Sequence, residues 1–88
     1  MSTDITTLVQ GDCAFCDHAR EILARLENEY PLTVRTIDID TDEGRRLAQE
    51  GGIMFAPGIF INDEPFSYGR LSERKLRKHL TRIAAPVS

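Results

Sequence analysis

The sequence contains no tryptophan, only two cysteines and no long apolar run. Without tryptophan, we expect the core to consist of Leu, Ile, Val and Phe. No stretch approaches the roughly 18 apolar residues that a membrane-spanning helix needs. Residues 1–4 carry no basic side chain, and no apolar stretch of signal-peptide length follows them, so we expect a cytoplasmic protein that does not bind membranes.

Length and composition predict one small globular domain. The chain has 88 residues, of which 41% are hydrophobic and 28% are charged. These proportions are typical of soluble folded proteins and argue against disorder. A chain of this size holds one core, so we expect a single domain over residues 1–88, ordered from about residue 4 to about residue 84.

The charge is unevenly distributed along the chain. The net charge is −3, yet residues 70–88 contain six Lys or Arg and one Glu. A run of charge is usually a solvated helix face, and the alternative is a docking surface for an acidic partner. We do not expect nucleic-acid binding, because the chain is acidic overall and the basic stretch holds no aromatic residue on which a base could stack.

The two cysteines stand three positions apart in Cys13-Ala14-Phe15-Cys16, between an apolar run and an amphipathic segment. Two cysteines are too few to stabilise a small secreted domain, and a pair in a reducing compartment indicates redox or metal chemistry. A thiol in the first turn of a helix meets unpaired N–H groups and the positive end of the helix dipole, so we expect a lowered pKa for Cys13. Cys16, one turn later, is then placed to resolve a mixed disulfide formed on Cys13.

Hydrophobic periodicity and turn residues predict an alternating series of strands and helices. Short runs rich in β-branched residues predict strands over residues 5–9, 32–39, 58–61 and 64–68. Apolar residues at helical spacing predict helices over about 13–29 and about 42–50, and a last helix that follows Ser72.

Several residues are expected to begin or anchor these helices. Asp40, with Glu43 as its reciprocal partner, is expected to cap the middle helix. Ser72 is expected to cap the last helix, whose buried stripe would consist of Leu76, Leu80 and Ile83. Gly44 is expected to weaken the middle helix.

The order of elements predicts an α/β fold. The first two strands are joined through a helix and should be parallel, whereas the last two are joined by a tight turn and should be antiparallel. The result is a four-stranded mixed sheet with helices on both faces.

This pattern resembles the thioredoxin superfamily, and in particular its compact glutaredoxin branch with the order β-α-β-α-β-β-α. The resemblance covers the chain from Ile5 to about Ile83. Three segments carry it: Cys13-Ala14-Phe15-Cys16, Ile37-Asp38-Ile39-Asp40, and Phe55-Ala56-Pro57-Gly58-Ile59-Phe60-Ile61-Asn62. The resemblance implies a thioredoxin-like fold and a cis Ala56–Pro57 bond beside the cysteines. The main chain of Ala56 would then pair with an extended substrate.

The chain departs from the glutaredoxin pattern at several places, one of which is Ala56, where glutaredoxins have a Thr in the proline loop. Glutaredoxins commonly have Pro-Tyr between the cysteines, a Lys shortly before them and a Gly-Gly-x-Asp turn before the last helix. Here Ala14-Phe15, Gln10 and Tyr68-Gly69-Arg70 stand at those places. Gly69 and the start of the last helix could still meet an anion, and Arg70 could replace the missing cation. The expected substrate-binding residues are therefore Phe15, Ala56, Pro57, Gly69 and Arg70.

Together, the residues and the resemblance predict a thiol–disulfide oxidoreductase with Cys13 as nucleophile and Cys16 as resolving thiol. We expect a monomer that reduces protein or low-molecular-weight disulfides, with glutathione or a reductase as electron donor. No cofactor is expected beyond the redox-active disulfide, with glutathione as a possible co-substrate. Asp12 and Asp17 oppose thiolate formation while the helix terminus favours it, so we expect a reduction potential of about −200 to −270 mV.

Two other functions stay open at this point. The same cysteines could bind a metal or share an iron–sulfur cluster across a dimer, with His18 as a further ligand. Cys16 and His18 stand two apart and point to different sides of a helix, so no metal site is expected. A redox-inert binding module would leave both thiols unexplained. Phe15, Phe55 and Tyr68 could form an apolar rim around the cysteines, although ordinary core or edge packing is the expectation for Phe55 and Tyr68.

Overall fold

The computed structural model describes residues 2–83. Over these residues the chain forms four strands and three helices in the predicted order: β1 (Thr3–Val9), α1 (Ala14–Glu27), β2 (Leu32–Asp38), α2 (Asp42–Gly51), β3 (Gly58–Ile61), β4 (Glu64–Tyr68) and α3 (Glu73–Ile83). The expected ordered limit near residue 84 lies outside the described residues. Between residues 2 and 83, no helix is long and apolar enough to cross a membrane.

The strands form one mixed sheet in the order β2-β1-β3-β4. β1 and β2 are parallel, with Ile5 opposite Val34. β3 is antiparallel to both β1 and β4. The predicted four-stranded mixed sheet is confirmed. β4 lies at the edge, where the missing N–H of Pro65 does not interrupt a central ladder.

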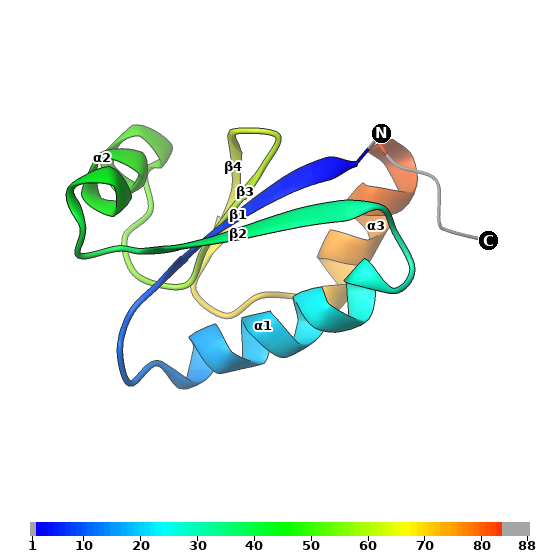
Figure 1. Ribbon diagram of the computed structural model, residues 1–88, viewed down its shortest axis with the longest axis horizontal. Helices are drawn as coiled ribbons and strands as arrows, with labels where there is room; N and C mark the ends of the chain where they lie inside the picture. Colours follow the sequence, from blue (N-terminus) through cyan, green and yellow to red (C-terminus); the bar gives the residue numbers. More distant parts are fainter. Residues whose placement is uncertain (1, 84–88) are drawn as a thin grey trace.

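Helices cover both faces of the sheet, as predicted (Figure 1). Side chains of a strand alternate between its two faces, and β3 shows this clearly. Ile59 and Ile61 pack with α1 and α3 in one buried cluster. Phe60, between them, packs in a second cluster with Leu8 of β1 and Leu47 of α2. The sheet therefore separates α1 and α3 from α2.

The start of α2 differs from the sequence expectation. Thr41, not Asp40, is the N-cap, and its Oγ1 accepts the N–H of Gly44 at 3.0 Å. Asp40 belongs to the preceding turn, where its N–H donates to the Asp38 carboxylate at 2.8 Å. Gly44 is also more than a weak helix residue, because a Cβ there would collide with the carbonyl oxygen of Asp38. The close contact between α2 and the end of β2 therefore requires glycine.

The last helix confirms one expectation and corrects another. Ser72 Oγ accepts the N–H of Lys75 at 3.2 Å, so Ser72 caps α3 as predicted. Leu76 and Leu80 are fully buried, whereas Ile83 is 44% exposed. The expectation that Ile83 completes the buried stripe was wrong, because the last residue of α3 extends past the apolar cluster that covers the sheet.

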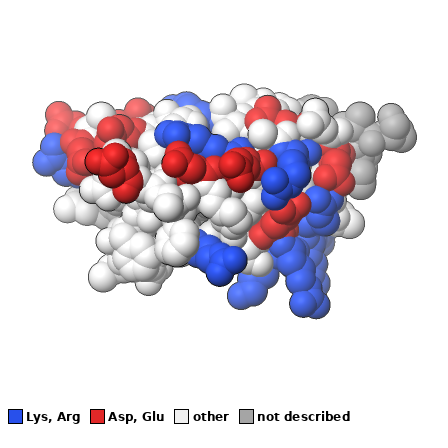
Figure 2. Space-filling model, turned by 90° about the horizontal axis from the view of Figure 1, so that it is seen from below, with Lys and Arg blue, Asp and Glu red and all other residues white. Residues whose placement is uncertain are grey.

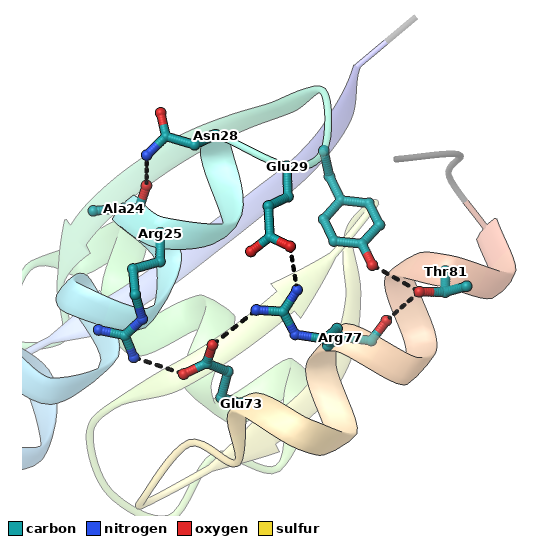
Figure 3. A network of polar contacts seen from close by, with 8 residues as sticks. Ala24, Arg25, Asn28, Glu29, Glu73, Arg77 and Thr81 are labelled. Atoms are coloured by element: carbon teal, nitrogen blue, oxygen red, sulfur yellow. Dashed lines mark hydrogen bonds and ion pairs between the residues drawn. The ribbon is translucent and has the colours of Figure 1, made fainter. Parts of the chain in front are cut away.

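Cationic side chains gather toward the end of the molecule where α3 lies (Figure 2). On the side of α3 that faces α1, cationic side chains are paired with glutamates (Figure 3). Arg77 donates to Glu29 and to Glu73, and Arg25 of α1 donates to the other oxygen of Glu73 at 2.6 Å. The hydrogen bonds from Arg25 and Arg77 lower the pKa of Glu73, and that from Arg77 lowers the pKa of Glu29. This charged network joins α1 to α3.

Candidate active site

Cys13 lies at the junction between β1 and α1. The turn before it places Asp12 at a positive φ of 51°, and Cys13 is the N-cap of α1. The N–H of Cys16 donates to Sγ of Cys13 at 3.1 Å. Cys13 and Cys16 form a disulfide, with their Cα atoms 5.1 Å apart. The sequence-predicted pair is thus brought together at the positive end of a helix.

The two halves of the disulfide differ in exposure. Cys13 is partly exposed, whereas Cys16 is only 1% exposed. Cys16 is enclosed by Val9 of β1 and by Ala56, with which it forms a small buried cluster. An incoming molecule can therefore approach the disulfide from the Cys13 side. The difference follows from their places along the helix. Cys13 caps its exposed end, whereas Cys16 lies one turn further in, where the helix packs on Val9 and Ala56.

The loop before β3 lies against the disulfide. Its Ala56–Pro57 peptide bond is cis. Ala56 is 8% exposed and packs in the cluster of Cys16, and Pro57 is fully buried. The carbonyl oxygen of Pro57 accepts the N–H of Gly69 at 2.9 Å, which connects the loop to the end of β4. Of the two loop residues expected at the site, Ala56 therefore lies against Cys16, and Pro57 follows it through the cis bond.

An exposed apolar rim accompanies the disulfide. Phe15 lies between the cysteines and is 50% exposed, and Phe55, next to Ala56, is 56% exposed. The ring of Tyr68 meets that of Phe55 edge to face, with 5.1 Å between ring centroids. Neither ring lies in the core, and the two pack against each other at the edge of the sheet, where Tyr68 ends β4, which fits the expected edge packing. Met54, at 74% exposure, was missed, although its place before the Phe55-Ala56-Pro57 segment could have revealed it.

Gly69 and Arg70 lie on the Tyr68 side of this rim. The N–H of Gly69 is already bonded to Pro57, so it is not available to an anion in this structure. The lack of a side chain at Gly69 leaves room for Phe55, because a Cβ there would lie 2.8 Å from the ring. Arg70 is exposed and lines a groove that includes Tyr68.

Charged neighbours of the disulfide lie on the surface. Asp17 is paired with Arg20 at 3.3 Å, whereas Asp12 has no ion-pair partner within residues 2–83. His18 lines a different cavity, with Arg70 and Glu73, rather than joining the cysteines. Across the described part of the chain, no group of three or more His, Cys, Asp or Glu side chains is arranged to hold a metal ion.

A cavity of about 540 Å³ opens on the other side of Ala56. Gln10 lines it together with Phe55 and Arg45 of α2. Arg45 was missed by sequence reasoning, because nothing in the pattern of α2 distinguishes it from Arg46. The cavity is large enough for a small peptide-like molecule, and it shares Ala56 with the cluster around Cys16.

Comparison with known proteins agrees with this geometry. The sequence matches the glutaredoxin-like domain family (DUF836) over residues 4–81. A probable thioredoxin of Archaeoglobus fulgidus is 27% identical over 71 residues, which cover 81% of this chain and 78% of that protein.

Solved structures share the fold. A mutant thioredoxin from Halobacterium salinarum superposes with a TM-score of 0.71 at 20% identity, covering 99% of this chain and 79% of that one. Plasmodium falciparum thioredoxin gives a TM-score of 0.67 at 17% identity, covering 98% and 75%. The fold, the disulfide and the family match support thiol–disulfide oxidoreductase chemistry in general. Because the family match spans most of its length, the chain belongs to the glutaredoxin-like domain family of the thioredoxin superfamily.

Proposed function

We propose that this protein is a dithiol–disulfide oxidoreductase that reduces protein or low-molecular-weight disulfides. The observation that carries the proposal is the asymmetry of the cysteine pair. Cys13 is partly exposed at the start of α1, and Cys16 is buried with its N–H directed at the Cys13 sulfur. A thiolate on Cys13 gains from that N–H and from the helix terminus. Cys13 is therefore the attacking thiol and Cys16 the resolving one.

The proposed reaction has two exchange steps. The Cys13 thiolate attacks one sulfur of the substrate disulfide, forming a mixed disulfide and releasing the other substrate sulfur as a thiolate. Cys16 then loses its proton and attacks the Cys13 sulfur, which releases the second substrate thiolate. The two substrate sulfurs gain two electrons and two protons, and the protein is left with the Cys13–Cys16 disulfide.

The surroundings of the disulfide support an extended polypeptide as substrate. Ala56 packs against Cys16, and Phe15 and Phe55 project apolar rings into solvent beside it. An extended segment can pair with the main chain of Ala56 as an added strand while its side chains contact the rim. Exposed aromatic side chains of this kind commonly anchor partners.

Single-cysteine variants test the assignment. The Cys16→Ser protein is mixed with a disulfide-bonded peptide, and the product is identified by mass analysis. We expect it to accumulate a mixed disulfide on Cys13, whereas Cys13→Ser forms none. The wild-type protein releases the reduced peptide with no trapped adduct. A mixed disulfide on Cys16 in the Cys13→Ser protein, but none on Cys13 in Cys16→Ser, would reverse the two roles.

We further propose glutathione as a co-substrate that returns electrons to the disulfide. The cavity beside Ala56 supports this, because Arg45 offers a cation to a carboxylate of a small peptide-like thiol. We expect glutathione alone to re-reduce the oxidised protein, and Arg45→Gln to raise the concentration required. Arg46→Gln is the matched control, since Arg46 is its exposed neighbour and does not line the cavity. No re-reduction by glutathione would make a reductase the donor.

A further inference from the structure

A groove of about 470 Å³ runs between the edge strand β4 and the outer face of α3. Four cationic side chains line it: Arg70, Lys75, Lys78 and Arg82. Lys75, Lys78 and Arg82 follow one another at intervals of three and four residues, which places them on one face of the helix. That face is about 10 Å long between its first and last cation. We call this surface the basic groove.

The cations of the basic groove are not neutralised by the described part of the chain. All four are exposed, and none forms an ion pair within residues 2–83. On the opposite side of the same helix, Arg77 is paired with both Glu29 and Glu73. One face of α3 is therefore ion-paired within the fold, and the face along the basic groove presents positive charge to solvent. Like charges held in one groove repel, and an anionic partner would relieve that repulsion.

The basic groove is continuous with the candidate active site. Tyr68 lines the groove, and its ring contacts that of Phe55. Phe55 precedes Ala56, which packs in the cluster of Cys16. A polypeptide that follows this path passes from the basic groove over the aromatic pair to the disulfide.

The rest of the chain carries the opposite charge. Residues 1–69 contain thirteen Asp or Glu and five Lys or Arg. An acidic polypeptide is therefore attracted to one end of the molecule and repelled elsewhere, which orients it as it approaches. About three residues of extended chain span the 10 Å of the helix face.

We propose that the basic groove binds an acidic segment of the polypeptide whose disulfide is presented to Cys13. This inference rests on the proposed function, which it extends by naming the substrate class: disulfide-bonded polypeptides with acidic residues flanking the cysteine. The groove selects such substrates by speeding their association, while the exchange steps at the cysteines stay the same.

The proposal is tested with two disulfide-bonded peptides. They differ only at three residues that flank the cysteine, which are Glu in one peptide and Gln in the other. We expect the reduced protein to react about tenfold faster with the acidic peptide at low ionic strength, and the advantage to shrink as salt is added. The variant Lys75→Gln/Lys78→Gln should lose most of this advantage. The control Arg35→Gln/Arg46→Gln removes two exposed cations from β2 and α2, and should keep it. Equal rates for the two peptides, or equal losses in both variants, would overturn the proposal.

Two further measurements separate this proposal from the others. Reduction of a small uncharged disulfide tests the proposed function alone. Its rate should be the same in wild type and in all variants. Binding of acidic and Gln peptides in which Ser replaces the cysteines tests the groove without any exchange chemistry, and the acidic peptide should bind more tightly. Equal binding of the two peptides would show that the basic groove does not bind acidic segments, whether or not the protein has exchange activity. Sedimentation that shows groove-dependent dimers, or tighter binding of a single-stranded oligonucleotide than of the acidic peptide, would assign the groove to another occupant.

Discussion

The backbone N–H of Cys16 donates a hydrogen bond to the sulfur of Cys13, with 3.1 Å between nitrogen and sulfur. The same residue that supplies this donor also supplies the buried sulfur of the pair. A donor directed at a sulfur stabilises its thiolate more than its thiol. One turn of helix thus gives the two cysteines unequal environments, one suited to attack and the other to resolution.

Alkylation of the reduced protein tests this inequality. In the Cys16→Ser protein, the hydrogen bond and the helix terminus should lower the pKa of Cys13 below the value of about 8.5 typical of a free thiol. The alkylation rate of Cys13 should therefore reach half its maximum below that pH. In the Cys13→Ser control, the buried Cys16 should react more slowly at every pH. Faster alkylation of Cys16 would contradict the assigned roles.

The aromatic rim should determine the rate with polypeptides but not with small disulfides. Phe55→Ser removes an exposed ring that contacts Tyr68 and lies next to Ala56. The loss of apolar contact is worth about 1–2 kcal/mol, so kcat/KM for a peptide disulfide with apolar flanks should fall about tenfold. Ile83→Ser is the control, because Ile83 is similarly exposed but lies at the end of α3. If the two substitutions had equal effects, the aromatic rim would not be part of the substrate-binding site.

A side chain at Gly69 should destabilise the fold. Its φ is +78°, and a Cβ there would lie 2.8 Å from the ring of Phe55. Gly69→Ala should therefore lower the free energy of unfolding by about 1–2 kcal/mol in a denaturant titration. Gly11→Ala is the matched control, because a Cβ at Gly11 would meet no other atom within 4 Å, and it should change stability by less than about 0.5 kcal/mol. Similar losses for both variants would refute this account of Gly69.

The charged network should stabilise the fold in a pH-dependent way. Hydrogen bonds from Arg25 and Arg77 lower the pKa of Glu73 in the folded protein from its ordinary value of 4.5. Stability from such a group is present above the unfolded pKa and is lost as pH falls through the folded pKa. The Tm of wild type should thus exceed that of Glu73→Gln near neutral pH, and the difference should shrink below about pH 5.

Glu27→Gln is the control for that measurement, since Glu27 is exposed on α1 and forms no ion pair within residues 2–83. Its Tm should follow that of wild type across the pH range. A Tm difference for Glu73→Gln that stays constant or grows on acidification would show that the network does not act through the Glu73 carboxylate.

The order of elements and the sheet could be predicted because each strand and helix has its own apolar pattern. The pattern of Ile59, Phe60 and Ile61 predicts a buried strand, and the structure shows its side chains divided between the two faces. Helix ends were less predictable, because Asp40 and Thr41 are both good capping residues. Their geometry in the turn, rather than their chemistry, makes Thr41 the cap.

The surroundings of the disulfide were the hardest part to predict. The contact between Phe55 and Tyr68 joins the loop before β3 to the end of β4, which a reading of each segment by itself does not show. The same is true of the hydrogen bond from Gly69 to Pro57. The charge of residues 70–88 was evident in the sequence, but its division into a paired face and the basic groove required the position of α1 beside α3.

The most direct test of the account is equilibration of the protein in graded mixtures of reduced and oxidised glutathione, followed by alkylation and mass analysis. Asp12 opposes thiolate formation and the helix terminus favours it, so we predict one sharp two-electron transition to the Cys13–Cys16 disulfide at about −200 to −270 mV. Two thiols that form no intramolecular disulfide at any ratio of the two forms of glutathione would contradict the account.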